Sequence, residues 1–234
     1  MNARAFGNTN SSDNINSSAP AGYAELFCFS NFSFLYGASH AEELVQQAHA
    51  LGYQALAITD ECSLAGVVRA HVEAEKCGLA LIIGSYFVSR ESLRFIALAP
   101  HKQAYHQLSS YISQARRRSE KGDYEVHVRD LERQLRDCLL IWLPEQAHTE
   151  SVGNDVHQLL QHTQDRLWIG IENDLSADTA HQLPYRLTLA QSLKLPVVAV
   201  GGVVMHNAGR KPLQDVLTAI RLNTSVYQAG FDLQ

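Results

Sequence analysis

Short apolar runs alternate with amphipathic stretches along most of the chain. Each run is followed by a polar break, after which apolar residues recur at helical spacing. The runs predict seven strands, at Leu26–Phe29, Ala55–Thr59, Leu79–Gly84, Leu93–Ala99, Leu139–Leu143, Arg166–Ile171 and Val197–Val200. Helices are predicted from Ser39, whose spacing to Glu42 suits a capping box, and over Ala65–Cys77, His101–Arg118, Val128–Leu135, Asp155–Thr163, Ala177–Leu193 and Arg210–Leu222.

The order of these elements indicates the fold class. Apolar strands that alternate with amphipathic helices are typical of a parallel sheet that is buried on both faces. Seven such units in 234 residues fit a closed or nearly closed α/β barrel better than an open doubly wound sheet. The turn after the first strand also lacks the Gly-x-Gly-x-x-Gly pattern of dinucleotide-binding sheets. In such a barrel, a functional site lies at the carboxyl ends of the strands.

The first 22 residues differ from the rest in composition. They are rich in Asn and Ser, and their bulky apolar residues are Phe6 and Ile15. Such a segment buries too little apolar surface to offset the entropy lost on ordering. We therefore expect residues 1–22 to be a disordered tail and residues 23–234 to form one barrel domain. The tail has no apolar core of a signal peptide, and no run approaches the ~20 apolar residues of a membrane helix.

Composition and charge argue against some classes of function. Hydrophobic residues make up 46% of the chain and charged residues 18%, and the net charge is −5. A surface built to grip nucleic acid is usually strongly basic, so we expect contact with DNA to be weak or indirect. The four cysteines lack Cys-x-x-Cys spacing, which favours small buried residues in the reducing cytoplasm over a disulfide framework or a zinc finger.

Three segments resemble motifs of one protein family. They are Glu25–Leu35, Ala57–Gly66 and Leu213–Thr224, and they occur in the family's order. They resemble the N-terminal PHP (polymerase and histidinol phosphatase) domain of bacterial C-family DNA polymerases, and more narrowly the error-prone, translesion branch of those alpha subunits. The resemblance runs from Tyr23 to the C-terminus and implies a distorted (β/α)7-type PHP barrel.

The resemblance also implies a function. The parent enzyme is a DNA-directed DNA polymerase, a nucleotidyltransferase of damage-induced translesion synthesis and DNA repair, whose magnesium is bound by a palm domain. The palm, fingers and thumb are missing from this sequence, so we expect the chain alone to be inactive and to need no cofactor. Its expected partner is the rest of the polymerase chain, with other translesion or replisome proteins as further partners and no membrane contact.

The metal-binding motifs that the resemblance implies are largely replaced. Competent family members hold two or three metal ions at the barrel mouth and hydrolyse phosphoesters, using His-x-His, Asp-His and later acidic and His positions. The corresponding positions here are Phe27, Phe29, Asp60, Glu61, Tyr86, Gly202 and Val204. Phenyl, phenol and isopropyl groups are not ligands for divalent metals, unlike imidazoles and carboxylates. Since Phe27 and Phe29 share one face of a strand, we expect their rings to fill the metal site and expect no catalytic residue.

Polar residues near the predicted strand ends keep a second interpretation open. They are Asp60, Glu61, Glu172, Asp174 and His206. A stand-alone metal-dependent phosphoesterase would use them in a rearranged metal site. In the structural interpretation they are loop residues and helix caps, and Asp60 caps the following helix.

One basic cluster suggests a third interpretation. Arg116, Arg117 and Arg118 lie together at the end of a predicted helix. Contact with DNA phosphates or with an acidic domain through them would make the chain an interaction module of a mutagenesis complex. Acidic residues lie among the basic ones that follow, so a solvated helix end is the plainer interpretation.

Overall fold

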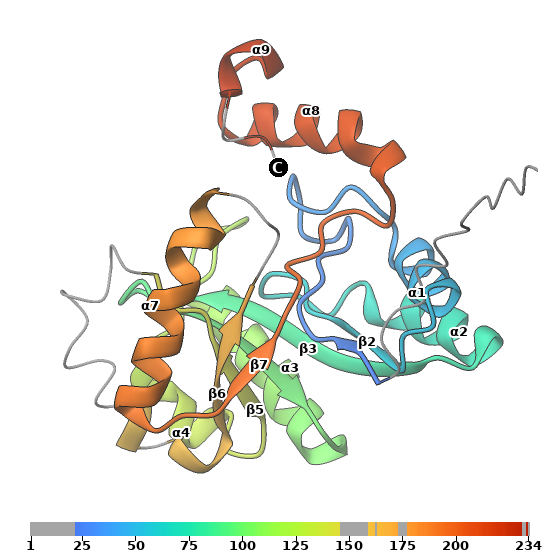
Figure 1. Ribbon diagram of the computed structural model, residues 1–234. Coiled ribbons are helices and arrows are strands. Elements are labelled where there is room, and N and C mark those ends of the chain that lie inside the picture. Colours follow the sequence, from blue (N-terminus) through green and yellow to red (C-terminus); the bar gives the residue numbers. More distant parts are fainter. Residues whose placement is uncertain (1–21, 146–158, 162, 173–176, 231–232, 234) are drawn as a thin grey trace, which may run out of the picture.

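The computed structural model describes residues 22–145, 159–161, 163–172, 177–230 and 233, and in it one seven-stranded sheet is surrounded by helices (Figure 1). The strands lie in chain order: β1 (Ala24–Glu25), β2 (Ala55–Ile58), β3 (Ala80–Val88), β4 (Arg94–Ala99), β5 (Leu139–Trp142), β6 (Leu167–Ile171) and β7 (Val197–Ala199). The helices are α1 (Ala41–Ala50), α2 (Val67–Cys77), α3 (Lys102–Arg117), α4 (Leu131–Gln134), α7 (Ala177–Leu193), α8 (Lys211–Arg221) and α9 (Val226–Ala229). Short 3₁₀ turns are η1 (Val128–Asp130), η2 (Gln164–Arg166) and η3 (Ala208–Arg210).

The strand directions correct one prediction. β1 to β3 and β5 to β7 are parallel, but β4 runs antiparallel to both β3 and β5. The expectation of an all-parallel sheet is therefore wrong at this strand. The link from β3 to β4 is the short turn Ser89–Leu93, and a parallel crossover needs a dozen or more residues. β3 is also longer than predicted and continues through Tyr86 to Val88.

The sheet curls into a nearly closed barrel, which confirms the predicted fold class. Closure occurs between the segment after β1 and the segment after β7. The Phe29 N–H donates to the Val203 carbonyl at 2.8 Å, and the Val203 N–H donates to the Phe27 carbonyl at 2.9 Å. The first strand was expected at Leu26–Phe29, but regular pairing with β2 covers Ala24–Glu25, and the expected residues form this seam instead.

Alternate residues of each strand point to opposite faces, and in the central strands both faces are buried. Along β4, Ile96 and Leu98 face the barrel interior, whereas Phe95 and Ala97 pack under the outer helices. The interior cluster comprises Phe27, Phe29, Ala57, Tyr86, Ile96, Leu98, Ile141, Leu143, Val200 and Val204. α1 and α2 cover the outside near β2, and α3, α4 and α7 cover the opposite side (Figure 1). The apolar filling of the barrel is thus a core in its own right.

The start of α1 tests one further prediction, and two others fall mostly outside the described residues. The capping box of α1 uses His40 and Glu43, one residue later than predicted, with the His40 N–H donating to Glu43 Oε2 at 2.9 Å. Most of the helix predicted at Asp155–Thr163, and the predicted tail apart from Gly22, lie outside the described residues. No described helix is long and apolar enough to cross a membrane.

Candidate functional site

Three of the positions matched to metal ligands meet as an aromatic cluster inside the barrel. The ring centroid of Phe27 lies 5.0 Å from that of Phe29 and 5.3 Å from that of Tyr86, and Phe29 and Tyr86 are also 5.3 Å apart. All three side chains are buried. Val204 belongs to the same cluster, and a Cβ at Gly202 would lie 3.6 Å from the Phe27 ring. Five of the seven matched positions therefore share one volume.

The polar end of this cluster is closed by an arginine. Arg94 Nε donates to the Tyr86 hydroxyl at 2.8 Å, and Arg94 also pairs with Glu145. Burial raises the pKa of Tyr86 to about 12, although Arg94 opposes the shift. The phenol therefore stays protonated at neutral pH. Two phenyl rings and a neutral phenol supply no ligand for a divalent cation, so these residues do not fit the metal ions of the family.

Asp60 has a different role from the one predicted. Its side chain is buried, and its oxygens accept hydrogen bonds from the Ser30 N–H (2.8 Å), the Ser30 hydroxyl (2.7 Å) and the Ser33 hydroxyl (2.7 Å). Burial raises the pKa of Asp60, and the Ser30 and Ser33 hydrogen bonds oppose that shift. The residue that caps α2 is Gly66, so the prediction of Asp60 as a helix cap is wrong. Asp60 instead fastens the loop after β1.

Glu61 turns away from the barrel interior. Tyr124 donates its hydroxyl proton to Glu61 Oε1 at 2.8 Å, and the Glu61 N–H donates to the Ser33 hydroxyl at 3.0 Å. Burial raises the pKa of Tyr124 well above its ordinary value, and the charge of Glu61 adds to the effect. This carboxylate therefore anchors Tyr124 of the loop before η1.

Glu172 and His206 are held in separate contacts. Glu172 Oε2 lies 2.8 Å from Arg186 Nη1, and the Arg186 side chain is buried with Nε donating to the Pro144 carbonyl at 3.0 Å. The His206 N–H donates to the Ser39 hydroxyl at 2.9 Å, and His206 Nδ1 lies 2.8 Å from the same oxygen.

The rearranged metal site of the second interpretation is not assembled in the described structure. Asp174 lies outside the described residues. Among the residues that are described, no three His, Cys, Asp or Glu side chains come close enough to hold a metal ion together. Asp60, Glu61, Glu172 and His206 each have protein partners of their own, as set out above.

The three arginines of the predicted basic cluster are all exposed, but two of them make internal contacts. The Arg116 guanidinium lies 5.3 Å from the centre of the Tyr124 ring. The carbonyl oxygens that accept hydrogen bonds from it at 3.3–3.5 Å are those of Glu61, Cys62, Gly122 and Asp123. Arg118 pairs with Asp130. Arg116 therefore clamps two loops, because main-chain carbonyls at a loop crossing are well matched to its planar fork of donors.

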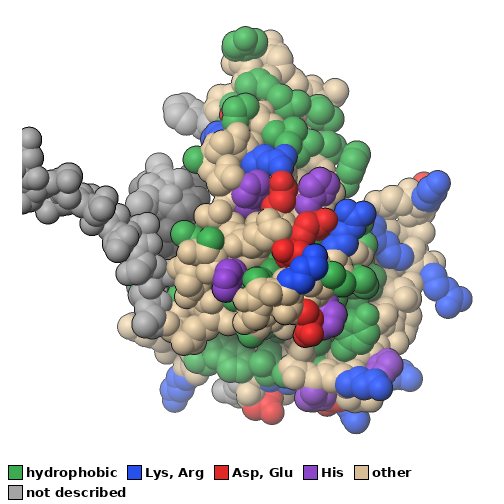
Figure 2. Space-filling view, turned by 90° about the vertical axis from the view of Figure 1, so that its right-hand side faces the viewer, with side chains coloured by type: hydrophobic (Ala, Val, Ile, Leu, Met, Phe, Trp, Pro, Cys, Tyr) green, Lys and Arg blue, Asp and Glu red, His purple; other side chains and the backbone are tan. Residues whose placement is uncertain are grey.

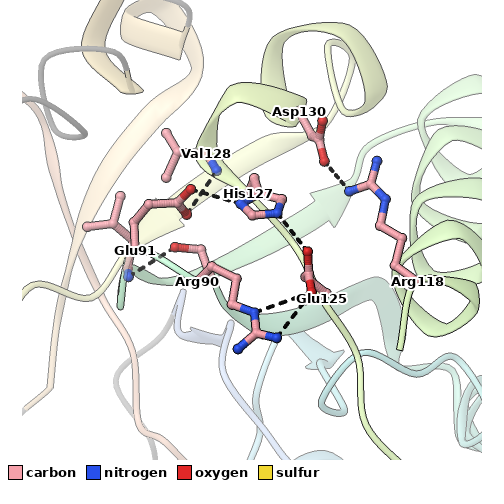
Figure 3. Close-up of polar contacts among 9 residues, drawn as sticks. Arg90, Glu91, Arg118, Glu125, His127, Val128 and Asp130 are labelled. Carbon is pink, nitrogen blue, oxygen red and sulfur yellow. Dashed lines mark hydrogen bonds and ion pairs between the residues drawn. The ribbon is translucent and has the colours of Figure 1, made fainter. Parts of the chain in front are cut away.

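A polar network that the sequence analysis missed ties the β3–β4 turn to the segment before η1 (Figure 3). His127 Nδ1 lies 3.0 Å from Glu91 Oε1, and Nε2 lies 2.9 Å from Glu125 Oε1. Arg90 Nη2 lies 3.1 Å from Glu125 Oε2. Burial lowers the pKa of His127, but the hydrogen bonds to the two carboxylates outweigh it and raise that pKa. A Glu-x-His stretch in a polar segment does not by itself predict such a network, because its partners lie far away in the sequence.

Glu25 is the second residue that the sequence analysis missed. It is 2% exposed, and its Oε1 accepts hydrogen bonds from the N–H groups of Phe27 and Gly201, both at 2.8 Å. Tyr23 donates its hydroxyl proton to Oε2 at 2.8 Å. A Cβ at Gly201 would lie 2.2 Å from Oε2, so only glycine allows this approach. In the sequence, the one sign of this role is that Glu25 is a carboxylate directly before the apolar run Leu26–Phe29.

The chain is similar in sequence to polymerases. A family model described as "PHP domain" matches residues 26–152. The error-prone DNA polymerase of Teredinibacter turnerae is 51% identical over 212 residues, which cover 91% of this chain and 20% of the relative. That of Saccharophagus degradans is 49% identical over 209 residues, 89% of this chain and 20% of the relative. The chain thus spans about a fifth of the length of these curated relatives.

Two solved structures share the fold. A Bifidobacterium adolescentis protein named as a metal-dependent phosphoesterase superposes with a TM-score of 0.53 at 16% identity, over 81% of this chain and 90% of the other. An amidohydrolase from Chromobacterium violaceum gives 0.51 at 14% identity, over 78% and 87%. At these identities the likeness supports the barrel fold alone.

Proposed function

The chain belongs to the PHP domain family, and on that premise we propose that it is the N-terminal PHP domain of an error-prone DNA polymerase, with a structural role and no metal centre. The observation that carries the structural role is the packing of Phe27, Phe29 and Tyr86 at the positions matched to metal ligands. The similarity to error-prone DNA polymerases over about 90% of the chain supports the parent enzyme.

The proposed role follows from what the barrel interior contains. Buried aromatic rings exclude the water and the ions that phosphoester hydrolysis needs, and each stabilises the core by roughly 1.5–3 kcal/mol. The rings of the cluster carry no carboxylate or imidazole that could activate a water molecule, and among the described residues no three His, Cys, Asp or Glu side chains gather to hold a metal ion. The domain therefore supports the polymerase as a rigid body, while nucleotidyl transfer and its magnesium belong to the rest of the enzyme.

The wider biological role is part of the same proposal. We assign the parent enzyme to damage-induced translesion synthesis and repair in the cytoplasm, acting with other translesion or replisome proteins. A domain that lacks a proofreading-competent site suits a polymerase of low fidelity. The net charge of −5 fits a domain that supports the enzyme without gripping DNA itself.

Activity assays on the 234-residue chain test the inactive site. Exonuclease, phosphodiesterase and primer-extension assays are run with magnesium, manganese or zinc, each with and without chelator. We expect no turnover above a buffer blank in any combination. Turnover that a chelator abolishes would contradict the proposal and favour the stand-alone phosphoesterase. Metal analysis of protein purified without chelator is the second readout. Near-stoichiometric zinc or manganese would also contradict the proposal and favour the stand-alone phosphoesterase.

The interaction module built on the basic helix end gains less support from the contacts. Arg116 is engaged with loop carbonyls and Arg118 with Asp130, so neither guanidinium is free to bind phosphate without losing internal contacts. Substituting Arg117, which is exposed, tests this alternative. DNA binding that falls at least tenfold in Arg117→Glu would favour it, and unchanged binding would remove it.

A further inference from the structure

Helix α8 buries two polar side chains, together with Ala219, against the rest of the molecule. Gln214 and Thr218 are 2% and 1% exposed, and in the described structure neither Gln214 Oε1 nor Thr218 Oγ1 has a hydrogen-bond partner. Leu213, Val216 and Ile220 are the exposed residues, at 41%, 44% and 56%. A helix that serves only its own domain does the reverse, because burying an unpaired polar group costs free energy.

The exposed residues form one continuous face. Leu213, Val216 and Ile220 are three and four residues apart, so they lie in one stripe along the helix. Leu213 also lines a shallow groove of about 260 Å³ together with Phe34, which is 81% exposed. We call Phe34, Leu213, Val216 and Ile220 the α8 face. Figure 2 shows hydrophobic side chains gathered at the top of the molecule, where Figure 1 places α8 and α9. Contiguous exposed apolar patches of this kind mark interaction sites.

We propose that the α8 face is the surface through which the barrel docks onto the polymerase portion of its enzyme, and this rests on the function proposed above. Two observations favour this occupant. The curated relatives are about five times as long as the region matched, so four-fifths of such an enzyme lies outside the barrel. The segment Leu213–Thr224, which resembles the error-prone branch, contains three of the four residues of the face.

The second observation carries weight because of where these residues lie. A sequence likeness inside the barrel is explained by the shared core. Leu213, Val216 and Ile220 contribute little to that core, since about half of each side chain is exposed. Apolar side chains that are half exposed in this way call for a partner surface outside the barrel. An apolar surface on the polymerase portion supplies it, because burying both surfaces removes apolar area from water.

A binding experiment between two polypeptides tests the assignment. The 234-residue chain is co-expressed with the polymerase portion of the Teredinibacter turnerae enzyme, which is the relative without its matched segment, and complexes are isolated through two tags and gel filtration. The test variant is Leu213→Glu/Ile220→Glu. The matched control is Val68→Glu/Val72→Glu, which places the same charges on two exposed apolar positions of α2. All four positions are exposed, so melting curves should show both variants as well folded as the parent.

We expect the parent and the α2 variant to form a complex and the α8 variant to lose at least tenfold in recovered complex. If the α8 variant binds as well as the parent, the docking surface lies elsewhere, although the proposed function stands. If the parent and the α2 variant also fail to bind, the proposed function and this assignment both fall. Sedimentation of the chain by itself gives the last outcome. If the parent is a dimer and the α8 variant is a monomer, the occupant is a second copy of the chain, and the assignment is overturned.

Discussion

At the scale of single residues, the packing of aromatic side chains fills the barrel interior. The Phe27 ring is stacked on Tyr86 and lies edge-on to Phe29, so it has neighbours on more than one side. A ring in that position fills space that the barrel cannot close by itself, because the strands around it are held by their own hydrogen bonds.

The first prediction concerns the filling itself. We expect Phe27→Ala to lower the free energy of unfolding by about 3–5 kcal/mol, the usual range for a buried Phe that leaves a cavity. Phe34→Ala is the control, because that ring is 81% exposed and its removal should change stability by less than about 0.5 kcal/mol. Urea titration of both variants measures the difference. Equal, small effects would show that the interior is not packed as described.

The second prediction concerns Glu25, which serves the barrel seam. Glu25→Ala leaves the buried N–H of Phe27 without an acceptor, at about 1–3 kcal/mol, and also removes the acceptor of the more exposed Gly201 N–H. Glu25→Gln keeps an oxygen at the same place and should destabilise clearly less. Denaturant unfolding of the two variants decides between them. If both variants lose the same stability, the charge and not the hydrogen bonding holds the seam.

At the scale of elements, polar contacts join segments that are distant in sequence. The β3–β4 turn and the segment before η1 are 30 or more residues apart in sequence, and His127 links them through Glu91 (Figure 3). Both ring nitrogens face carboxylate oxygens, an arrangement that favours the protonated ring, which donates from both nitrogens. The join between these two segments is therefore sensitive to pH.

The third prediction follows from the sign of these shifts. The pKa of His127 is raised above its ordinary 6.5, so its stabilising contribution is complete below that pH and is lost as the pH rises through the raised value. The pKa values of Glu91 and Glu125 are lowered from 4.5, so their contribution is lost only in more acidic solution. We expect His127→Gln to destabilise the protein by roughly 1 kcal/mol at pH 6 and by less at pH 9. His71→Gln, at an exposed position on α2, is the control and should show no such trend.

The whole molecule behaves as a barrel closed around an apolar centre, and the fourth prediction belongs to this scale. A ligand that binds only the folded state raises the melting temperature in proportion to the logarithm of its concentration over Kd. With no metal centre to fill, the melting temperature should be the same within about 1 °C in chelator and in millimolar magnesium, manganese or zinc. Differential scanning fluorimetry measures this. A rise of several degrees that chelator reverses would reveal a metal site and overturn the filled-barrel interpretation.

The sequence by itself determined most of the elements and the chemical type of the side chains at the positions matched to metal ligands. Apolar runs fixed six of the seven strands to within a few residues, because a strand buried on both faces has to be apolar throughout. The exchange of metal-ligand types for Phe27, Phe29 and Tyr86 is likewise legible, because ligand chemistry belongs to the side chain and not to its surroundings. The family resemblance, which rests on local motifs, was confirmed for the same reason.

The tertiary structure decided everything that depends on partners distant along the chain. The reversed direction of β4 follows from a short turn, but its pairing with β5 is a long-range contact. Asp60 looks like a helix cap from its neighbours, and only folding brings Ser30 and Ser33 to its oxygens. Arg116 looks like part of a basic patch until the loops that it clamps are in place. On α8, periodicity predicts an apolar stripe but not whether that stripe faces the core, because both orientations satisfy the helix equally.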